Sequence, residues 1–414
     1  MEFLSPILGR DTESLEWGSI LPIAETQEER LGGFSKVTKV RFHEMHITPH
    51  LKVNQKVALK VSTFDVDDEV DKEGILEMFQ KEIEVLKIMR ELDDDHLIKF
   101  VTSFSLPGDI FIVFPWAEAG NLRDLWFRED GGQRMSPSRI LEQLRGVFNG
   151  ISKIHAKDCV HGDLKPENLL LFPEPGTSPL GTRLQIVVAD FGLATVYENP
   201  TAVRRVNQQF TKTVWRTPDY EAPEFEDSHP QDIVRSRSFD IWQMGCISLE
   251  FLIWWHGGCT GLSDFHNKIP NEKFWKETSD DASLSRVDRR GVHPVVLEAM
   301  QKMRASVYFW NSKQGAFLSY IQEQLIVAEN NGKKRPESSK VVERIDQILE
   351  GFEGLEVEML QVVRGRSRKG WNVGKRLFKG VTSFSLKILL FLYRVISGGK
   401  YGLFDSNLGF PCAC

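Results

Sequence analysis

The sequence reads His161-Gly162-Asp163-Leu164-Lys165-Pro166-Glu167-Asn168 and, after a short gap, Ala189-Asp190-Phe191-Gly192. The first stretch places a carboxylate, an ammonium group and an amide on one compact loop, and the second adds a carboxylate after an apolar run. Phosphoryl transfer needs these groups: one Asp orients and deprotonates a hydroxyl, a Lys neutralises charge, and Asn with a second Asp binds magnesium through oxygen. Each stretch alone is weak evidence, since a lone Asp-Phe-Gly is more often an ordinary turn.

The chain before the first stretch has the pattern of a small sheet with one helix. Strand-like segments occur at 30–40, 57–61, 100–104 and 110–114. Residues 75–92 carry apolar side chains at helical spacing, with charged residues between them. We therefore expect a small antiparallel sheet with one amphipathic helix, followed by a polar hinge that contains a glycine.

The chain after this hinge has helical patterns. Apolar residues recur at steps of three and four along 141–154, and residues 239–255 are apolar almost all round, which indicates a fully buried helix. Between them, residues 159–190 have the pattern of short strands and loops that carry polar side chains, where chemistry usually sits.

These motifs, in this order, resemble the signature set of the protein kinase family. The resemblance implies an α+β, two-lobed fold: a small N-lobe with an antiparallel sheet and one helix, and a larger, mainly helical C-lobe, with ATP in the cleft. It places the kinase domain at 27–350, with the N-lobe at about 27–116 and the C-lobe at about 117–350. Residues 1–26 are then an N-terminal extension, and 351–414 are a C-terminal tail.

The resemblance assigns the transfer chemistry to the two quoted stretches. Asp163 would be the catalytic base, and Lys165 would contact the transferring phosphate. Asn168 and Asp190 would hold Mg²⁺. The expected cofactors are ATP and Mg²⁺.

A lysine and a glutamate of the N-lobe complete the expected machinery. Lys60 matches the family's strand lysine, and Glu82 matches the helix glutamate that pairs with it. The pair would anchor the α- and β-phosphates of ATP. Glu84 is the rival partner by sequence proximity. The alternative interpretation is a solvated surface lysine, with Glu82 as one Glu of several on an exposed helix face.

The resemblance also implies an adenine pocket. Val37 and Ala58 would close it from above and Leu170 from below, while the backbone of 114–117 would bond the purine. Phe114 is at the gatekeeper position, which predicts a shallow back pocket. The expected nucleotide-binding residues are Gly32, Gly33, Val37, Ala58, Lys60, Phe114, Trp116, Ala117 and Leu170.

The glycine-rich loop departs from the family pattern. Gly32 keeps the middle glycine, but Arg30 and Ser35 occupy the outer glycine places. Side-chain bulk there restricts the close approach of backbone amides to phosphate. Slow turnover or a tilted loop is therefore expected.

Two features indicate a serine or threonine acceptor. Lys165-Pro166-Glu167 follows Leu164, as in serine/threonine kinases, and Thr217 is where that class keeps a threonine near the catalytic Asp and Lys. The expected partner is a protein substrate with a Ser or Thr hydroxyl. Glu118 and Glu167, near the expected peptide path, hint at basic substrates, although acidic residues at a cleft rim are usually just solvated.

The expected activation segment runs from residue 190 to 224. Glu224 would form a structural bridge with Arg335. Gly162 replaces the arginine that normally precedes the catalytic Asp and grips a phosphate on this segment. We therefore hypothesise that activity does not depend on phosphorylation of the segment, whose candidate sites are Thr201, Thr211 and Thr213.

Two further groups match the family's internal supports. His161, Phe191, Leu86 and Phe100 fall where the family stacks a hydrophobic spine. Asp240 falls where the buried helix grips the catalytic loop. These residues support the fold more than the activity.

Two rival functions remain. A pseudokinase, acting as a nucleotide-binding or scaffold module, is favoured by the altered glycine loop and by Gly162. It is opposed by the intact Lys60, Asp163, Asn168 and Asp190. A small-molecule kinase of similar fold is disfavoured by the Ala222-Pro223-Glu224 segment, which in protein kinases docks a peptide.

Composition narrows the setting. A net charge of −6 argues against a nucleic-acid partner, which needs a concentrated positive field. Five scattered cysteines are the wrong pattern for a disulfide framework, and the N-terminus lacks the features of a secretory signal, so an intracellular, cytoplasmic protein is expected. The tail is basic over 364–379 and apolar over 381–396, which suits a membrane surface or a partner groove; a helix docked on the large lobe or a poorly ordered extension fits equally well.

Overall fold

The computed structural model divides the chain into two compact units, residues 1–345 and 346–414. The residues that it describes are 13–15, 19–31, 35–43, 55–62, 69–128, 135–174, 176–177, 183–196, 218–225, 235–269, 273–277, 279, 289–329 and 333–364. Of the second unit, it describes the continuation of one helix, α7 (Ser338–Arg364), which begins in the first unit. Several predicted features lie outside the described residues: Gly32, Gly33, Thr201, Thr211, Thr213, Thr217 and the tail beyond Arg364.

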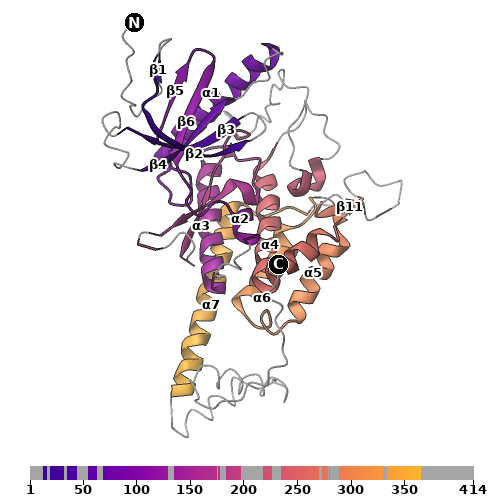
Figure 1. Cartoon of the computed structure of the whole chain (residues 1–414). Coiled ribbons are helices and arrows are strands. Elements are labelled where there is room, and N and C mark those ends of the chain that lie inside the picture. Colours follow the sequence, from indigo (N-terminus) through magenta and orange to yellow (C-terminus); the bar gives the residue numbers. More distant parts are fainter. Residues whose placement is uncertain are drawn as a thin grey trace. The chain divides into compact units, whose positions relative to one another are not determined.

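The N-lobe is built on a sheet that has six strands within the described part of the chain (Figure 1). They are β1 (Glu13–Ser14), β2 (Ile23–Leu31), β3 (Ser35–Phe42), β4 (Lys56–Ser62), β5 (Thr102–Leu106) and β6 (Asp109–Pro115), in the order β1-β5-β6-β4-β3-β2. Neighbouring strands from β2 to β6 pair antiparallel, which confirms the predicted sheet. β1 adds a two-residue parallel pairing with β5, which is too short to leave a pattern in the sequence.

Alternation along β4 sends its side chains to two different faces. Val57 and Leu59 are buried in an apolar cluster with Val40 and Phe42 of β3. Lys60 is on the opposite face, where its ammonium group meets a carboxylate of helix α1 (Glu69–Leu92). The sheet thus keeps its core on one side and presents a cation on the other.

Helix α1 is the amphipathic helix that the sequence predicts. Its apolar residues Ile75, Phe79, Ile83, Leu86 and Met89 are all buried. The helix packs against β4 and β6. A polar side chain on its buried face is therefore directed toward the sheet.

The C-lobe is mainly helical. Its helices in the described part of the chain are α2 (Leu122–Trp126), α3 (Pro137–Ala156), α4 (Arg237–His266), α5 (Pro294–Ala305), α6 (Lys313–Tyr320) and the start of α7 (Ser338–Arg364). Shorter helical pieces are η2 (Pro166–Asn168), η3 (Pro218–Tyr220), η4 (Pro223–Phe225) and η7 (Ile321–Leu325). The two-lobed fold is therefore confirmed.

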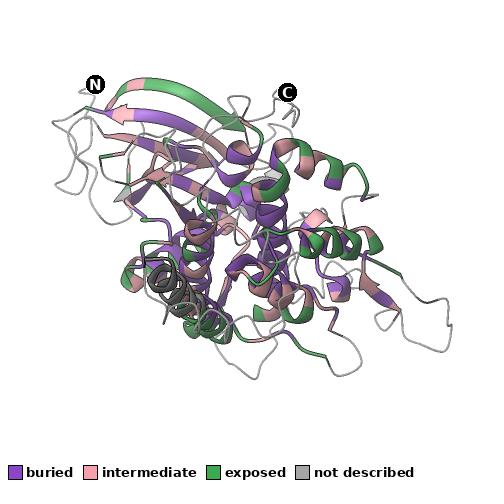
Figure 2. Ribbon diagram, turned by 90° about the horizontal axis from the view of Figure 1, so that it is seen from below, coloured by how far each residue is buried: buried purple, intermediate pink, exposed green. Residues whose placement is uncertain are grey.

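Helix α4 is the buried helix expected at 239–255. Its residues are buried without a break from Phe239 to Trp254, and Figure 2 shows the purple of buried helices inside this lobe. The helix is longer than expected and ends at His266, because it continues past a non-helical residue, Gly258, at φ 71°. A glycine adopts this conformation at little cost. The helical spacing of apolar residues is interrupted at Gly258, so the sequence pattern stops short of the end of the helix.

Short strands between the helices carry the polar loops. β7 (Cys159–Val160) pairs antiparallel with β10 (Thr195–Val196), and β8 (Leu169–Pro173) pairs antiparallel with β9 (Leu184–Val188). A further hairpin joins β11 (Trp275–Glu277) and β12 (Arg290–Val292). The first quoted stretch therefore lies between β7 and β8, and the second follows β9. Among the described residues, no helix is long and apolar enough to cross a membrane.

Candidate active site

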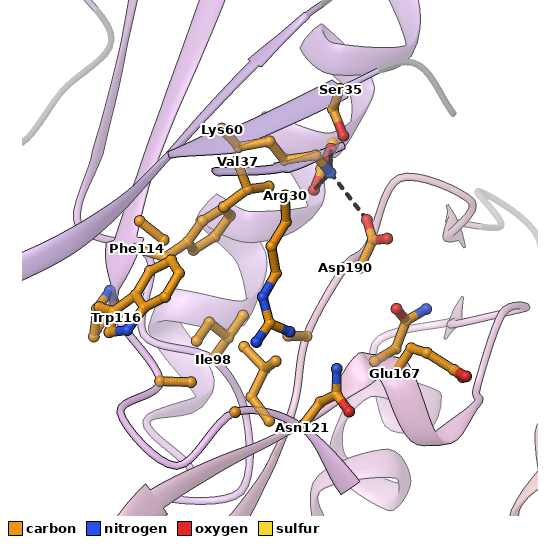
Figure 3. A pocket seen from close by; sticks show the side chains of 18 of the residues that line it. Arg30, Ser35, Val37, Lys60, Ile98, Phe114, Trp116, Asn121, Glu167 and Asp190 are labelled. Atoms are coloured by element: carbon orange, nitrogen blue, oxygen red, sulfur yellow. Dashed lines mark hydrogen bonds and ion pairs between the residues drawn. The ribbon is translucent and has the colours of Figure 1, made fainter. Parts of the chain in front are cut away.

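A cavity of about 390 Å³ lies where the sheet meets the loops of the C-lobe (Figure 3). The predicted site residues that line it are Val37, Ala58, Lys60, Glu82, Phe114, Trp116, Ala117, Asn168, Leu170 and Asp190. Its size is in the range of small-molecule and cofactor pockets. The structure therefore brings the predicted nucleotide and metal residues of the described chain to one cavity.

Lys60 is the electrostatic centre of this cavity. Its Nζ donates to both carboxylate oxygens of Glu82 at 2.8 Å and to Oδ1 of Asp190 at 2.9 Å. Figure 3 shows the dashed line from Lys60 to Asp190 across the cavity. Glu84 is exposed on the other face of α1, so the structure pairs Lys60 with Glu82 and not with the rival.

Lys60, Glu82 and Asp190 influence one another's pKa values. The ammonium of Lys60 holds the pKa of Asp190 at about 2, although burial opposes this effect. Burial alone would lower the pKa of Lys60, but the two carboxylates raise it above its usual value. Burial raises the pKa of Glu82, and Lys60 counters that rise. Asp190 therefore stays ionised as an oxygen donor at neutral pH.

The first quoted stretch forms a second cluster. Nζ of Lys165 donates to Oδ2 of Asp163 at 2.8 Å, and Nδ2 of Asn168 donates to the same oxygen at 3.1 Å and to the Asp163 carbonyl at 2.8 Å. Asp163 is 7% exposed, so its carboxylate is held in one orientation. Asp163 and Lys165 do not themselves line the cavity, but they are bonded directly to Asn168, which does.

Asp240 fixes the backbone that carries this cluster. It is fully buried at the start of α4 and accepts the backbone N–H groups of His161 at 2.9 Å and Gly162 at 2.8 Å. Nε2 of His155 lies 2.8 Å from the same carboxylate. Because buried N–H groups need partners, the Asp240 carboxylate fixes the start of the loop at 161–168.

The two quoted stretches are joined to each other. The ring of His161 packs against Phe191 with centroids 4.9 Å apart, and its Nε2 lies 3.1 Å from the Ala189 carbonyl. The Ala189 N–H donates to the Asn168 carbonyl at 2.9 Å. Asp190 then adopts a left-handed φ of 64°, which is uncommon outside glycine and turns its side chain toward Lys60.

The residues that the family resemblance assigns to an adenine pocket lie in the cavity walls. Val37 and Ala58 come from neighbouring strands of the sheet, and Leu170 comes from β8 opposite them. Phe114, at the end of β6, and Ile98 add apolar surface (Figure 3). Trp116 and Ala117 follow β6 and line the same space.

Some lining residues were not predicted. Ile98, Gly120, Asn121 and Ala189 also line the cavity. Asn121 could have been found from its spacing to Asp124, because the two form a capping box at the start of α2. Nothing in the local pattern marks Ile98, which comes into place through the tertiary fold.

Arg30 has a role in the structure that its sequence position did not indicate. It lines the cavity, and its Nη1 donates to Oδ2 of Asp124 in α2 at 3.0 Å. Figure 3 shows its side chain running from the sheet toward Asn121, across the opening. Arg30, which replaces the first glycine of the family's glycine-rich loop, thus forms a hydrogen bond between the two lobes.

Glu224 and Arg335 form the bridge that the sequence predicts. The two guanidinium nitrogens lie 2.6 and 2.9 Å from the two carboxylate oxygens. The Arg335 side chain is fully buried and also packs over Trp242 at 4.9 Å. This bidentate pair lies away from the cavity, so it supports the fold.

The oxygen donors fit magnesium. Asn168 and Asp190 both line the cavity, and the hydrogen bonds of Asn168 use its amide nitrogen, so its amide oxygen is the atom suited to a metal. Within the described ranges, no group of three or more His, Cys, Asp or Glu side chains could hold an ion alone. Mg²⁺ usually takes one or two protein oxygens and completes its shell with water and substrate phosphates.

Comparison with known proteins gives consistent matches. The model of the family described as "Protein kinase domain" matches residues 32–342. The SNF1-related protein kinase catalytic subunit alpha KIN12 of Arabidopsis thaliana is 29% identical over 230 residues, 56% of this chain and 39% of that protein. The probable cyclin-dependent kinase 8 of Dictyostelium discoideum is 28% identical, over 48% of each chain. Human serine/threonine-protein kinase H1 is 29% identical, over 53% of this chain and 44% of its own length. The chain thus matches less than half the length of these relatives.

Proposed function

This chain belongs to the protein kinase domain family, and from that membership we propose that it is a serine/threonine protein kinase that transfers the γ-phosphate of ATP to Ser or Thr hydroxyls of proteins. One observation carries the proposal: Lys60, Asn168 and Asp190 line one cavity, and Asp163 is hydrogen-bonded to Asn168 at its edge. A base, a phosphate-binding cation and two metal-binding oxygens are thus present together.

ATP would bind in this cavity. The purine would lie between Val37 and Ala58 on one side and Leu170 on the other, because these residues line the cavity together with those that follow Phe114. The phosphates would then reach Lys60, whose orientation is held by Glu82. An ammonium that is already oriented stabilises phosphate charge without reorganising in the transition state.

The transfer step assigns one role to each loop residue. The acceptor hydroxyl oxygen forms a bond to the γ-phosphorus, the bond from that phosphorus to the β–γ bridging oxygen breaks, and ADP leaves. Asp163 orients the hydroxyl and accepts its proton. Lys165, 2.8 Å from Asp163, is placed to neutralise charge on the transferring phosphoryl group.

Magnesium would be held by Asn168 and Asp190. The bound ion supplies positive charge that stabilises the phosphate oxygens during transfer. The low pKa of Asp190 suits this role, because its carboxylate stays ionised at neutral pH.

The choice of serine or threonine rests on Lys165 and Thr217. Lys165 begins the Lys-Pro-Glu sequence that is typical of the serine/threonine class, and its Nζ donates to Asp163. Of the relatives described above, human serine/threonine-protein kinase H1 carries this class in its name. The pseudokinase alternative is opposed by the intact Lys60, Asp163, Asn168 and Asp190, each of which has the neighbours that catalysis needs.

The setting of the enzyme is part of the proposal. We place the kinase domain at 27–350 and the protein inside the cell, where thiols stay reduced. Cys159 and Cys246 are buried and form no disulfide bond, and burial raises the pKa of both thiols, which favours the protonated form. Fractionation of cells that express the tagged chain tests the location and shows whether part of it pellets with membranes.

A phosphotransfer assay tests the activity. The full chain is incubated with magnesium and γ-labelled ATP in the presence of peptide libraries with Ser, Thr or Tyr as the acceptor. We expect label on Ser and Thr peptides and none on Tyr peptides. Label on Tyr alone would overturn the acceptor class, and no label on any library, with ATP binding intact, would overturn the enzyme proposal.

A further inference from the structure

Arg123 connects three elements at the edge of the candidate active site. It is on α2, and its Nε donates to Oε1 of Glu167 on η2 at 2.8 Å. Its Nη2 donates to the hydroxyl of Tyr220 on η3 at 2.9 Å. The guanidinium group of Arg123 therefore donates hydrogen bonds in two directions, to two separate segments of the chain. The ammonium group of a lysine could not reproduce this geometry.

A buried acidic group lies behind this contact. The Tyr220 hydroxyl donates to Oε2 of Glu250 at 2.7 Å, and Nε2 of His266 lies 2.6 Å from Oε1 of the same carboxylate. Glu250 is 1% exposed. Burial would lower the pKa of Arg123, but attraction to Tyr220, Glu250 and Glu167 raises it, so the guanidinium stays charged.

Glu167 is placed where a peptide substrate would pass. It follows Lys165 by two residues on the same loop and lines the cavity beside Asn168 (Figure 3). An extended peptide advances about 3.3 Å per residue, so side chains a few residues from the acceptor come within reach of this carboxylate. An unpaired carboxylate here would favour arginine or lysine in the substrate.

Glu118, the second acidic residue near the cleft, also has a cation from its own chain. Nζ of Lys39 lies 3.3 Å from Glu118 and 3.3 Å from Glu28. Lys39 is 5% exposed and lies over the ring of Trp116 at 4.9 Å. Both acidic residues that hinted at basic substrates are therefore neutralised internally.

We infer that Arg123 is a specificity-determining residue, which occupies the acidic subsite of Glu167 and Glu250 and so prevents selection of arginine or lysine near the acceptor. The inference rests on the proposed function, because that function supplies the acceptor site. A basic substrate side chain would have to break the charge-assisted bonds of Arg123 and would bring a like charge beside it.

The test measures peptide binding, with the full chain, magnesium and a non-hydrolysable ATP analogue. Fluorescent peptides carry Ala at the acceptor and either Arg or Gln at each neighbouring position in turn. The proteins are wild type, Arg123→Gln, Arg123→Gln/Glu167→Gln, and the control Arg139→Gln. Arg139 suits as the control because its side chain is 26% exposed, close to the 24% of Arg123, and its pairs with Glu142 and Glu174 lie outside the cavity.

Wild type and Arg139→Gln should bind Arg and Gln peptides with affinities within about twofold of each other. Arg123→Gln should bind the Arg peptide about tenfold more tightly at one or more positions, equivalent to about 1.4 kcal/mol. The double variant should lose this gain. A preference for arginine already present in wild type, or equal affinities in Arg123→Gln, would overturn the inference.

A single variant keeps the test independent of how well Arg123→Gln folds. Glu167→Gln alone should leave the ratio of Arg to Gln affinities unchanged, because its carboxylate is already paired. A change of more than about twofold in that ratio in Glu167→Gln would also overturn the inference. Binding needs no phosphate transfer, so an inactive chain would contradict the proposed function and leave this measurement decisive.

Discussion

Lys60 and Glu82 meet as a buried ion pair, with Nζ 2.8 Å from each carboxylate oxygen and Glu82 only 2% exposed. The pair joins β4 to α1, so the position of one helix sets the orientation of the cation in the cavity. The strand therefore positions Lys60, and the helix orients its ammonium group within the cavity.

Glu82→Gln should weaken both the fold and the activity. The variant removes the charge that compensates a buried ammonium, and we expect a loss of about 1–3 kcal/mol in the free energy of unfolding, because Asp190 still pairs with Lys60. Denaturant unfolding measures the loss. Glu84→Gln, exposed on the same helix, is the matched control and should leave stability unchanged. Equal effects of the two variants would contradict the pairing.

Lys60→Met should shift the titration of Asp190. In the wild type, Lys60 depresses the pKa of Asp190 from 3.8 to about 2, so the stability from this carboxylate is present above pH 3.8 and is lost as the pH falls through about 2. Without the ammonium, the pKa should rise, and the loss should begin at higher pH. NMR titration of the Asp190 carboxyl measures both proteins, and an unchanged pKa would contradict this account.

Asp240→Ala should destabilise the catalytic loop. The change leaves the N–H groups of His161 and Gly162 buried without their acceptor, at a cost of about 1–3 kcal/mol for each group. Asp240→Asn keeps an oxygen acceptor and should cost less. Hydrogen exchange should show faster exchange of these two amides in Asp240→Ala, and unaltered protection would refute the assigned role.

Gly162→Ala should lower the free energy of unfolding, because the backbone conformation disfavours a side chain and a Cβ atom would clash with its neighbours. Gly162 has φ +76°, and an added Cβ would lie 2.5 Å from Cδ of Arg235 and 3.3 Å from the Leu193 carbonyl oxygen. Gly176, at φ +79° with nothing within 4 Å, isolates the backbone effect. We expect about 1–2 kcal/mol for Gly176→Ala and a larger loss for Gly162→Ala. Equal losses would show that the space above Gly162 can adapt.

Arg30→Gly should strengthen nucleotide binding. The change restores the glycine of the loop and removes the Arg30–Asp124 pair from the cavity opening. The two side chains are 49% and 40% exposed, so the pair is worth at most about 1 kcal/mol and the gain in ATP affinity should be about two- to fivefold. Calorimetry measures the affinity. Weaker ATP binding would show that Arg30 itself holds the nucleotide.

The sequence could place candidate site residues close together where they belong to one short motif. Asp163, Lys165 and Asn168 share one loop, so their spacing alone brings them together, and Asp190 follows a strand whose end is fixed by pairing with β8. The change in periodicity near the hinge indicated a small sheet followed by helices, and the resemblance to protein kinases implied the two-lobed fold class.

The remaining features depend on contacts that no local pattern contains. Arg123 meets Glu167 and Tyr220, which are 44 and 97 residues away. From the sequence, Arg30 was only a departure from the glycine pattern of the loop. Its hydrogen bond to Asp124, 94 residues away, depends on the packing of the two lobes. The end of α4 was missed because a glycine at φ 71° interrupts the pattern within the helix.

The most direct test of the central claim compares wild type with Asp163→Asn. Both proteins are first shown to bind ATP with equal affinity, and the rate of magnesium-dependent γ-phosphate transfer to a Ser/Thr peptide library is then measured. The account predicts transfer by the wild type and a loss of about 10²–10⁴-fold in the variant, because the base that accepts the hydroxyl proton is gone. Equal rates in the two proteins, or ATP binding by both with transfer by neither, would contradict it.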